Sequence, residues 1–262
     1  MLRLPPPGTL ETMAAVLVTG ASSGIGAALA RIYAAPGTAL MLCGRDGERL
    51  AAVAEDCRRV GATVEAATID VTDRVAMAEW IARCDDAAPL SLVIANAGVS
   101  AGTGGGGESA EQTRRIFAVN VDGVINTIHP ALDRMAPRRA GGIAIMSSLA
   151  SFRGFPGAPA YCASKAAVRV LGEALRGDLR ATGIAVSVVC PGYVESPMTA
   201  VNRFPMPLLM SADRAAAIIR RGIDRGRPRI AFPWPMYAAV RLLAALPPAW
   251  SDPLLRRLPR KE

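Results

Sequence analysis

The chain has 262 residues, of which 51% are hydrophobic and 20% are charged, and its formal net charge is +8 at pH 7. This length suits one large α/β domain, and the composition excludes an intrinsically disordered chain. Five cysteines without a C-x-x-C pair, a single histidine and the lack of a long apolar run argue against a disulfide framework, a metal site and a membrane span, so we expect reduced thiols and a cytoplasmic protein.

Residues 1–12 are proline-rich and are predicted to form a disordered extension, so a single catalytic domain is expected over 13–262. Within it, short apolar runs alternate with segments of helical spacing. The predicted strands are 14–18, 38–43, 63–69, 91–95, 142–147 and 184–189, with 229–232 as a candidate last strand. The predicted helices are 26–35, 46–59, one opened by Thr72 and Asp73, 109–135 and 160–181. This alternation predicts an α/β fold, a Rossmann-like doubly wound parallel sheet with helices on both faces.

The first predicted strand runs into T-G-A-S-S-G-I-G, which places glycines at 20, 24 and 26. Gly20 allows a sharp turn off the strand, Gly24 leaves room for a pyrophosphate, and Gly26 lets the next helix sit close to the strand. The helix N-terminus then offers free N–H groups to the phosphates. A glycine triplet alone is weak evidence, but this one follows a strand and opens a helix, so we predict dinucleotide binding.

The end of the second predicted strand indicates which dinucleotide is bound. An NAD site usually places an acid there to bind the ribose hydroxyls, but this strand ends in Cys43, Gly44 and Arg45. The guanidinium of Arg45 suits a 2′-phosphate, although Asp46 follows directly. We therefore predict NADP as the cofactor, with NAD as the alternative.

Only two of the 30 basic residues are lysines, and one of them, Lys165, follows Tyr161 by four positions in Y-C-A-S-K. On a helix, residues i and i+4 share one face. A nearby cation lowers the pKa of a phenol, which is about 10 in water. The spacing therefore predicts a tyrosine that Lys165 prepares for proton transfer. Ser148 ends the fifth predicted strand, where a hydroxyl can hold a substrate oxygen beside this phenol.

Taken together, these motifs resemble the short-chain dehydrogenase/reductase family. The resemblance rests on T-G-A-S-S-G-I-G (19–26), D-V-T (70–72), N-A-G (96–98), F-A-V-N-V-D-G (117–123), S-S (147–148), Y-C-A-S-K (161–165) and P-G-Y-V-E-S (191–196). They occur in family order and spacing over 14–199. The resemblance implies an oxidoreductase that transfers hydride between a nicotinamide cofactor and a carbonyl or secondary alcohol, without a metal.

The resemblance also implies a role for each matching residue. Tyr161 would be the general acid and base, Lys165 would lower its pKa and hold the nicotinamide ribose, Ser148 would polarise the substrate oxygen, and Asn120 would fix a helix kink and a water. The implied cofactor-binding residues are Gly20, Ser22, Ser23, Gly24, Ile25, Gly26, Arg45, Asp70, Val71, Asn96, Ala97, Gly98, Tyr161, Lys165, Pro191, Gly192, Val194 and Ser196. Two positions depart from the family pattern: Ser196 stands where threonine is common, and the glycine loop carries no basic residue.

The last quarter of the chain raises further expectations. Residues 198–210 are rich in methionine, leucine and proline, so they are expected to form a substrate loop for a lipophilic carbonyl or alcohol, or else simply to pack. Residues 200–262 hold 12 basic and 4 acidic residues, whereas 1–199 are balanced. With the apolar stretch 232–248, this appendage is a candidate for peripheral contact with the inner membrane surface, an active-site cap or a dimer interface. No nucleic-acid motif accompanies the basic residues.

Two other functions stay open at this point. A reductase of acyl-thioester ketones would carry basic residues beside its pocket, because coenzyme and carrier groups are anionic. A non-catalytic dinucleotide-sensing protein would have lost Tyr161, Lys165 or Ser148, and all three are present. A homodimer or homotetramer is expected from the family resemblance.

Overall fold

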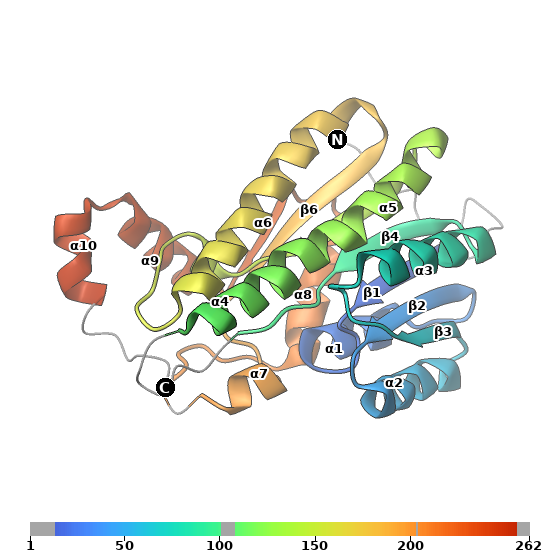
Figure 1. The fold of residues 1–262 in the computed structure, drawn as a ribbon, viewed down its shortest axis with the longest axis horizontal. Helices are drawn as coiled ribbons and strands as arrows, with labels where there is room; N and C mark the ends of the chain where they lie inside the picture. The colour runs from blue at the N-terminus through green and yellow to red at the C-terminus, as the bar shows by residue number, and fades with distance from the viewer. Residues whose placement is uncertain (1–13, 101–107, 203, 256–262) are drawn as a thin grey trace.

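The structure is a computed structural model that describes residues 14–100, 108–202 and 204–255 (Figure 1). The predicted disordered extension at 1–12, the glycine-rich stretch 101–107 and the basic residues after 255 lie outside the described residues.

Seven parallel strands form one sheet in the order β3-β2-β1-β4-β5-β6-β7. The strands are β1 Ala14–Thr19, β2 Thr38–Gly44, β3 Thr63–Thr68, β4 Leu90–Ala95, β5 Gly141–Met146, β6 Ile184–Pro191 and β7 Arg229–Phe232. The strand order reverses between β1 and β4, where open α/β sheets bind their ligands. The predicted Rossmann-like sheet is therefore confirmed, and the candidate strand at 229–232 is its last strand.

Helices cover both faces of the sheet, as Figure 1 shows. One face packs on α1 Gly24–Tyr33, α2 Gly47–Arg59 and α8 Ala212–Asp224. The other packs on α3 Arg74–Ala87, α5 Gly123–Arg138 and α6 Pro159–Asp178. The inner strands are buried on both faces because both are covered. The edge strand β3 is an exception to the expected pattern. Its side chains are exposed or partly exposed, and it pairs with a neighbouring strand, β2, on one side only.

Two aspartates start the helices that follow β2 and β3. Asp46 accepts a hydrogen bond from the N–H of Arg49 and begins α2. Asp73 accepts from the N–H groups of Val75 and Ala76 and begins α3, which confirms the predicted cap at Thr72 and Asp73. These caps satisfy backbone groups that a helix end otherwise leaves without partners.

The predicted helix 109–135 is not one uniform helix. It consists of α4 Ala110–Phe117, a π-helical turn at Ala118–Asp122 and α5. Such π turns insert an extra residue and are common at functional sites. Asn120 lies in this turn, so the helix is irregular at the residue for which a kink was predicted.

The C-terminal quarter is more ordered than the sequence indicated. A short helix, α7 Pro197–Ala200, is followed by a bridge between Val194 and Met210 and then by α8. After β7, helices α9 Trp234–Ala245 and α10 Pro248–Leu255 lie to one side of the sheet, coloured red in Figure 1. No helix among the described residues is long and apolar enough to cross a membrane.

Candidate active site

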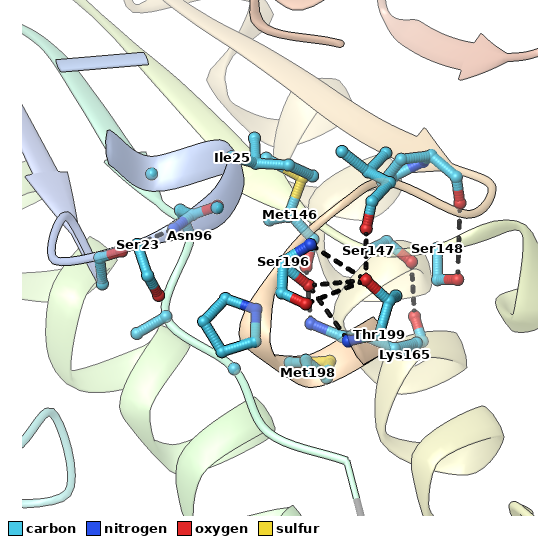
Figure 2. Close-up of a pocket in the computed structure, with 18 of the residues that line it drawn as sticks. Ser23, Ile25, Asn96, Met146, Ser147, Ser148, Lys165, Ser196, Met198 and Thr199 are labelled. Carbon is cyan, nitrogen blue, oxygen red and sulfur yellow. Dashed lines mark hydrogen bonds between the residues drawn. The ribbon is translucent and has the colours of Figure 1, made fainter. Parts of the chain in front are cut away.

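A pocket opens at the carboxyl ends of β1, β4, β5 and β6 (Figure 2). Its lining brings together most of the predicted site residues from five separate sequence motifs. The lining residues are Gly20, Ser23, Gly24, Ile25, Gly26, Asn96, Ala97, Gly98, Met146, Ser147, Ser148, Tyr161, Lys165, Pro191, Gly192, Val194, Ser196, Pro197, Met198 and Thr199. Ser22, Arg45, Asp70, Val71 and Asn120 are the predicted residues that do not line it.

The glycine loop forms one wall of the pocket, and its geometry requires glycine. Gly20 and Gly24 have φ angles of +65° and +52°, which L side chains rarely adopt. A Cβ on Gly26 would lie 2.1 Å from the carbonyl oxygen of Gly20. The amide of Asn96 supports the loop from below by donating to the carbonyls of Thr19 at 2.9 Å and Gly20 at 3.3 Å. The backbone is thus free to approach a pyrophosphate at the start of α1, which fits a dinucleotide.

The end of β2 has little room for the acid that an NAD site carries. A Cβ on Gly44 would lie 3.2 Å from the hydroxyl oxygen of Ser22. Asp46, the nearest acid, is engaged as the cap of α2 and binds the guanidinium of Arg49 at 2.6 Å. The backbone and side-chain hydrogen bonds from Arg49 lower the pKa of Asp46. Asp46 is therefore occupied within its own helix.

Arg45 and Asp70 face each other beyond the pocket, with Nη1 and Oδ2 4.0 Å apart. Both side chains are largely exposed. Burial raises the pKa of Asp70, but hydrogen bonds from the N–H and hydroxyl of Thr72 and the charge of Arg45 outweigh it, so the net shift is downward. Arg45 is thus a weakly paired cation at the position predicted for the 2′-phosphate, and an exposed pair of this kind is worth little by itself.

Tyr161, Lys165 and Ser148 converge at the centre of the pocket. Lys165 is 3% exposed, and its Nζ lies 5.9 Å from the centre of the Tyr161 ring, so the two residues share one face of α6 as predicted. The ammonium donates to the carbonyl of Met146 at 3.0 Å. Ser148 is held at the end of β5 by a hydrogen bond from the N–H of Ala150 at 3.1 Å. A substrate oxygen in the pocket would therefore meet both hydroxyls.

The direction of the Tyr161 pKa shift differs from the prediction. Burial raises the pKa of Tyr161, and a hydrogen bond with Ser148 lowers it only in part. Lys165 does not offset the burial because its ammonium turns to Met146 rather than to the phenol oxygen. Burial also lowers the pKa of Lys165 from 10.5 to about 8. In this structure the phenol is therefore protonated at neutral pH, and burial makes it a weaker acid than a free phenol.

Asn120 links the π turn to the catalytic wall. It is fully buried, accepts from the N–H of Val99 at 2.8 Å, and donates both to the Val99 carbonyl and to Ser164 at 3.0 Å each. Ser164 in turn donates to the carbonyl of Tyr161 at 2.9 Å. A Cβ on Gly98 would lie 3.1 Å from Lys165 Nζ and 3.2 Å from Asn120 Oδ1, so Gly98 closes the space above both groups.

Met146 and Pro197 line the pocket without having been predicted, whereas Met198 and Thr199 belong to the expected substrate loop, and α7 brings Pro197, Met198 and Thr199 to the pocket. Ser196 caps this short helix by accepting from the N–H of Thr199 at 3.2 Å, while the Thr199 hydroxyl accepts from the N–H of Ser196 at 2.9 Å. Figure 2 shows these bonds beside Met198. The S-P-M-T spacing is a signal for such a reciprocal cap. Ser196 is thus partly committed to the helix, and its Cβ sits 2.9 Å from where a Gly24 Cβ would lie.

Glu108 is a further missed residue, and it lies 52 positions before the residue that it binds. The first residue of α6 follows Ala158, whose side chain cannot cap the helix. Glu108 supplies the cap instead, because its Oε2 accepts from the N–H of Ala160 at 2.6 Å. A carboxylate at a helix N-terminus is stabilised by the free N–H groups and by the helix dipole. The residue next to Ala160 is Tyr161, so this cap fixes the end of the helix that carries the phenol.

Replacing Glu108 with alanine is expected to lower the melting temperature by about 2–6 °C, since a lost cap costs about 1–2 kcal/mol in a chain of this size. Glu108→Gln keeps an acceptor oxygen and is expected to retain most of the stability. Thermal unfolding followed by circular dichroism measures both. Equal melting temperatures for the wild type and Glu108→Ala would show that the contact does not stabilise α6.

The predicted substrate loop at 198–210 divides into packed and exposed residues. Met210 is buried and bridges to Val194, and Phe204 packs edge-on against Tyr193 with ring centres 6.1 Å apart. Val201, Leu208 and Leu209 are exposed. The loop therefore anchors at both ends and presents apolar side chains between them.

Other reactive groups do not add a second centre. All five cysteines are free and buried, and burial raises the pKa of Cys43 and of the site neighbours Cys162 and Cys190. Buried thiols with raised pKa values are poor nucleophiles. Across the described ranges, no three His, Cys, Asp or Glu residues are grouped so that they could hold a metal ion.

The sequence and the fold are both similar to those of known oxidoreductases. A family model described as short chain dehydrogenase matches residues 14–205. An uncharacterized oxidoreductase of Myxococcus xanthus is 41% identical over 243 residues, which covers 92% of this chain and 96% of the relative.

Two solved structures share the fold over nearly their whole length. A short-chain dehydrogenase from Sphingobium yanoikuyae in complex with NADPH is 28% identical, with a TM-score of 0.78 over 95% of this chain and 98% of the other. A short-chain dehydrogenase/reductase from Burkholderia phymatum in complex with NAD is 26% identical, with a TM-score of 0.81 over 97% and 99%.

Proposed function

The chain belongs to the short-chain dehydrogenase family, and we propose that it transfers hydride between NADP and a lipophilic carbonyl or secondary alcohol. The observation that carries the proposal is the convergence of Ser148, Tyr161 and Lys165 in the pocket whose wall is the glycine loop. In this arrangement the side chains that can exchange a proton and the loop that can bind a pyrophosphate line the same pocket, as a nicotinamide-dependent oxidoreductase requires.

The residues of the pocket divide the work as follows. The glycine loop and the N-terminus of α1 would hold the pyrophosphate, while Lys165, Asn96, Pro191, Gly192, Val194 and Ser196 would hold the nicotinamide riboside. When bound, the nicotinamide supplies or accepts the hydride. Ser148 donates a hydrogen bond to the substrate oxygen and stabilises the negative charge that develops there.

Tyr161 delivers the proton to the same oxygen during reduction and removes it during oxidation. Its phenol is protonated at neutral pH, which is the form that reduction requires. Asn120 and Ser164 position the first turns of α6 through their bonds to Val99 and to the Tyr161 carbonyl.

Preference for NADP is supported by the charges at the end of β2. Gly44 leaves no carboxylate to repel or replace a 2′-phosphate, Asp46 is bound to Arg49, and the exposed guanidinium of Arg45 is held only weakly by Asp70. The solved relatives include one complex with NADPH and one with NAD, so the family comparison leaves both cofactors open.

Replacing Arg45 with alanine is expected to raise the KM for NADPH about tenfold and to leave the KM for NADH nearly unchanged, because one exposed charge-assisted contact is worth about 1.4 kcal/mol. Arg59→Ala is a matched control, since Arg59 is an exposed arginine paired with Asp56 at the other end of α2. Initial rates at varied cofactor concentration give both constants. A parallel rise in both KM values would contradict a 2′-phosphate contact.

A lipophilic substrate is supported by the apolar side chains of the segment that begins at Met198. Met198 lines the pocket, and Val201, Leu208 and Leu209 of the same segment are exposed. An acyl-thioester ketone is less well supported as the substrate, because its anionic carrier group would need basic residues beside the pocket. Among the described lining residues the one cation is Lys165, which is buried.

The decisive experiment follows the absorbance of NADPH as the protein is mixed with a panel of ketones of increasing chain length. Turnover that rises with apolar chain length supports the proposal. A protein that binds NADPH but oxidises it with no ketone of the panel would instead be a cofactor sensor.

We also propose that the protein is a cytoplasmic homo-oligomer that pairs through its long helices. Its free, buried thiols suit a reducing compartment. Phe117, Ile125 and Val170 on α4, α5 and α6 are exposed and apolar, as expected of a surface that a second copy covers. Sedimentation equilibrium of the wild type and of Ile125→Asp tests the pairing.

A further inference from the structure

The C-terminal helix pair, α9 and α10, presents large apolar side chains to solvent. Trp234 is 70% exposed, Trp250 is 69% exposed and Leu242 is 67% exposed. The two tryptophans are the most exposed large apolar side chains of the described residues. Among the rings of the described residues, that of Trp234 packs only against Tyr237 of its own helix, at 5.8 Å between ring centres, and tryptophans this exposed are expected at a surface that something else covers.

One face of α9 packs on the enzyme. Met236 and Tyr237 join the cluster of Leu149 and Phe152, and the Tyr237 and Phe152 rings are 5.4 Å apart. The Met236 sulfur lies 2.9 Å from where a Cβ on Gly192 would sit, and Gly192 lines the pocket. The helix pair is therefore fixed directly beside the pocket.

The other face of α9 has no polar side chain at its centre. Trp234, Pro235, Ala239, Leu242 and Ala245 are all exposed, and helical periodicity places them on one broad side. A surface helix of a soluble protein normally turns charged residues outward. The exposed residues Ala249, Trp250 and Pro253 extend this character into α10.

The helix pair itself is balanced in charge, and the positive charge beside it lies in the residues that follow it in the sequence. Its one acid, Asp252, is bound to Arg153 at 2.8 Å, and its one cation, Arg241, lies over the Phe152 ring at 5.6 Å. Residues 256–262, which follow α10 in the sequence, hold four basic residues and one acidic residue. A second copy of the chain would bring the same positive charge to a self-paired interface, which opposes pairing there. A surface of acidic lipid headgroups attracts it.

We propose that the C-terminal helix pair binds the surface of an anionic lipid bilayer, with Trp234, Leu242 and Trp250 entering the headgroup layer. Tryptophan prefers this layer because its ring is apolar and its N–H can still reach water. α9 has 12 residues, so it lies on the surface rather than across the bilayer. Because Met236 packs against Gly192, binding of the helix pair to the bilayer would hold the pocket beside the lipid. Easier access of a lipophilic substrate to the pocket would follow, and this consequence rests on the proposed function.

Binding is tested without any assay of activity. The full chain is mixed with vesicles of phosphatidylcholine alone or of phosphatidylcholine with phosphatidylglycerol, and the bound fraction is measured by sedimentation. The chain has three tryptophans, and Trp80 is fully buried in the core. Quenching of tryptophan emission by brominated lipid therefore reports on Trp234 and Trp250. We expect quenching and sedimentation with the anionic vesicles, and release by added salt.

The variant Trp234→Ser/Leu242→Ser/Trp250→Ser is expected to partition into anionic vesicles on the order of a hundredfold less than the wild type, because three large apolar contacts are lost. A matched control is Val60→Ser/Val75→Ser, which removes exposed apolar side chains from α2 and α3 and should bind like the wild type.

Two results would overturn the proposal: wild type that neither sediments with anionic vesicles at low salt nor is quenched by brominated lipid, or a triple variant that binds as tightly as the control. A triple variant that binds no less but sediments as a smaller oligomer would show that a second copy covers this face. NADPH oxidation with a water-soluble ketone tests the proposed function separately, since its failure with normal vesicle binding would leave the membrane surface standing.

Discussion

Replacing Tyr161 with phenylalanine is expected to lower kcat for ketone reduction by about 10²–10⁴-fold, the usual contribution of a positioned general acid. The change removes the hydroxyl that donates the proton and keeps the ring that lines the pocket. The affinity for NADPH should therefore change little, and so should thermal stability. Steady-state rates and a fluorescence titration with NADPH measure the two effects separately.

The matched control is Tyr237→Phe. Tyr237 does not line the pocket: its hydroxyl accepts a hydrogen bond from Arg229 at 3.3 Å, and its ring packs against Phe152 with centres 5.4 Å apart. It should retain nearly full activity. If Tyr161→Phe turned over ketones as fast as this control, another group would have to supply the proton, and the proposed chemistry would have to be abandoned.

The sequence predicted the parts of the fold that follow from local patterns. Buried strands appear as short apolar runs, and the glycine loop and the Tyr161–Lys165 spacing are contiguous motifs. The helix α6 carries both catalytic candidates on one face because four residues make about one turn. Asp46 and Asp73 were readable as helix starts for the same reason: a cap lies beside the residues that it binds.

What the sequence left out depends on contacts between distant segments. The cap that Glu108 gives to α6 joins residues 52 positions apart, so no local pattern indicates it. The direction of the Tyr161 pKa shift was missed because it depends on where Lys165 points: spacing puts the ammonium on the right face, but the Met146 carbonyl of β5 draws it inward. The π turn at Asn120 likewise requires Val99, which lies 21 residues away.

Replacing Lys165 with methionine is expected to abolish most of the activity and to make the folded protein more stable at neutral pH. The buried ammonium donates a hydrogen bond to the Met146 carbonyl at 3.0 Å, and burial lowers its pKa from 10.5 to about 8. A shift of this size corresponds to roughly 3 kcal/mol against folding with the charge in place. Leaving the carbonyl without its donor costs about 1–3 kcal/mol, so a net gain of about 0–2 kcal/mol is expected.

The control Lys165→Arg keeps the charge and adds volume. Lys165 is 3% exposed and its Nζ is held by the Met146 carbonyl, so a larger guanidinium would have to displace its neighbours. This variant should lose both activity and stability. Urea unfolding of the three proteins at pH 7 gives their relative free energies. A methionine variant less stable than the wild type would mean that the ammonium stabilises the fold, and the assumed cost of its burial would be wrong.

The pH dependence of stability gives an independent check on the same group. Because the pKa of Lys165 is lower in the folded state than in the unfolded state, the unfolded chain binds more protons between about pH 8 and pH 10.5. The free energy of unfolding therefore rises with pH through this window, as the buried ammonium loses its proton. This gain in stability is lost again as the pH falls through about 8. Lys165→Met lacks this contribution, so its advantage over the wild type should shrink from pH 7 to pH 9.5. If the difference in free energy of unfolding between the two proteins stayed constant over that range, Lys165 would not titrate with a lowered pKa. The view that this site gives up stability to keep an ammonium beside the phenol would then be wrong.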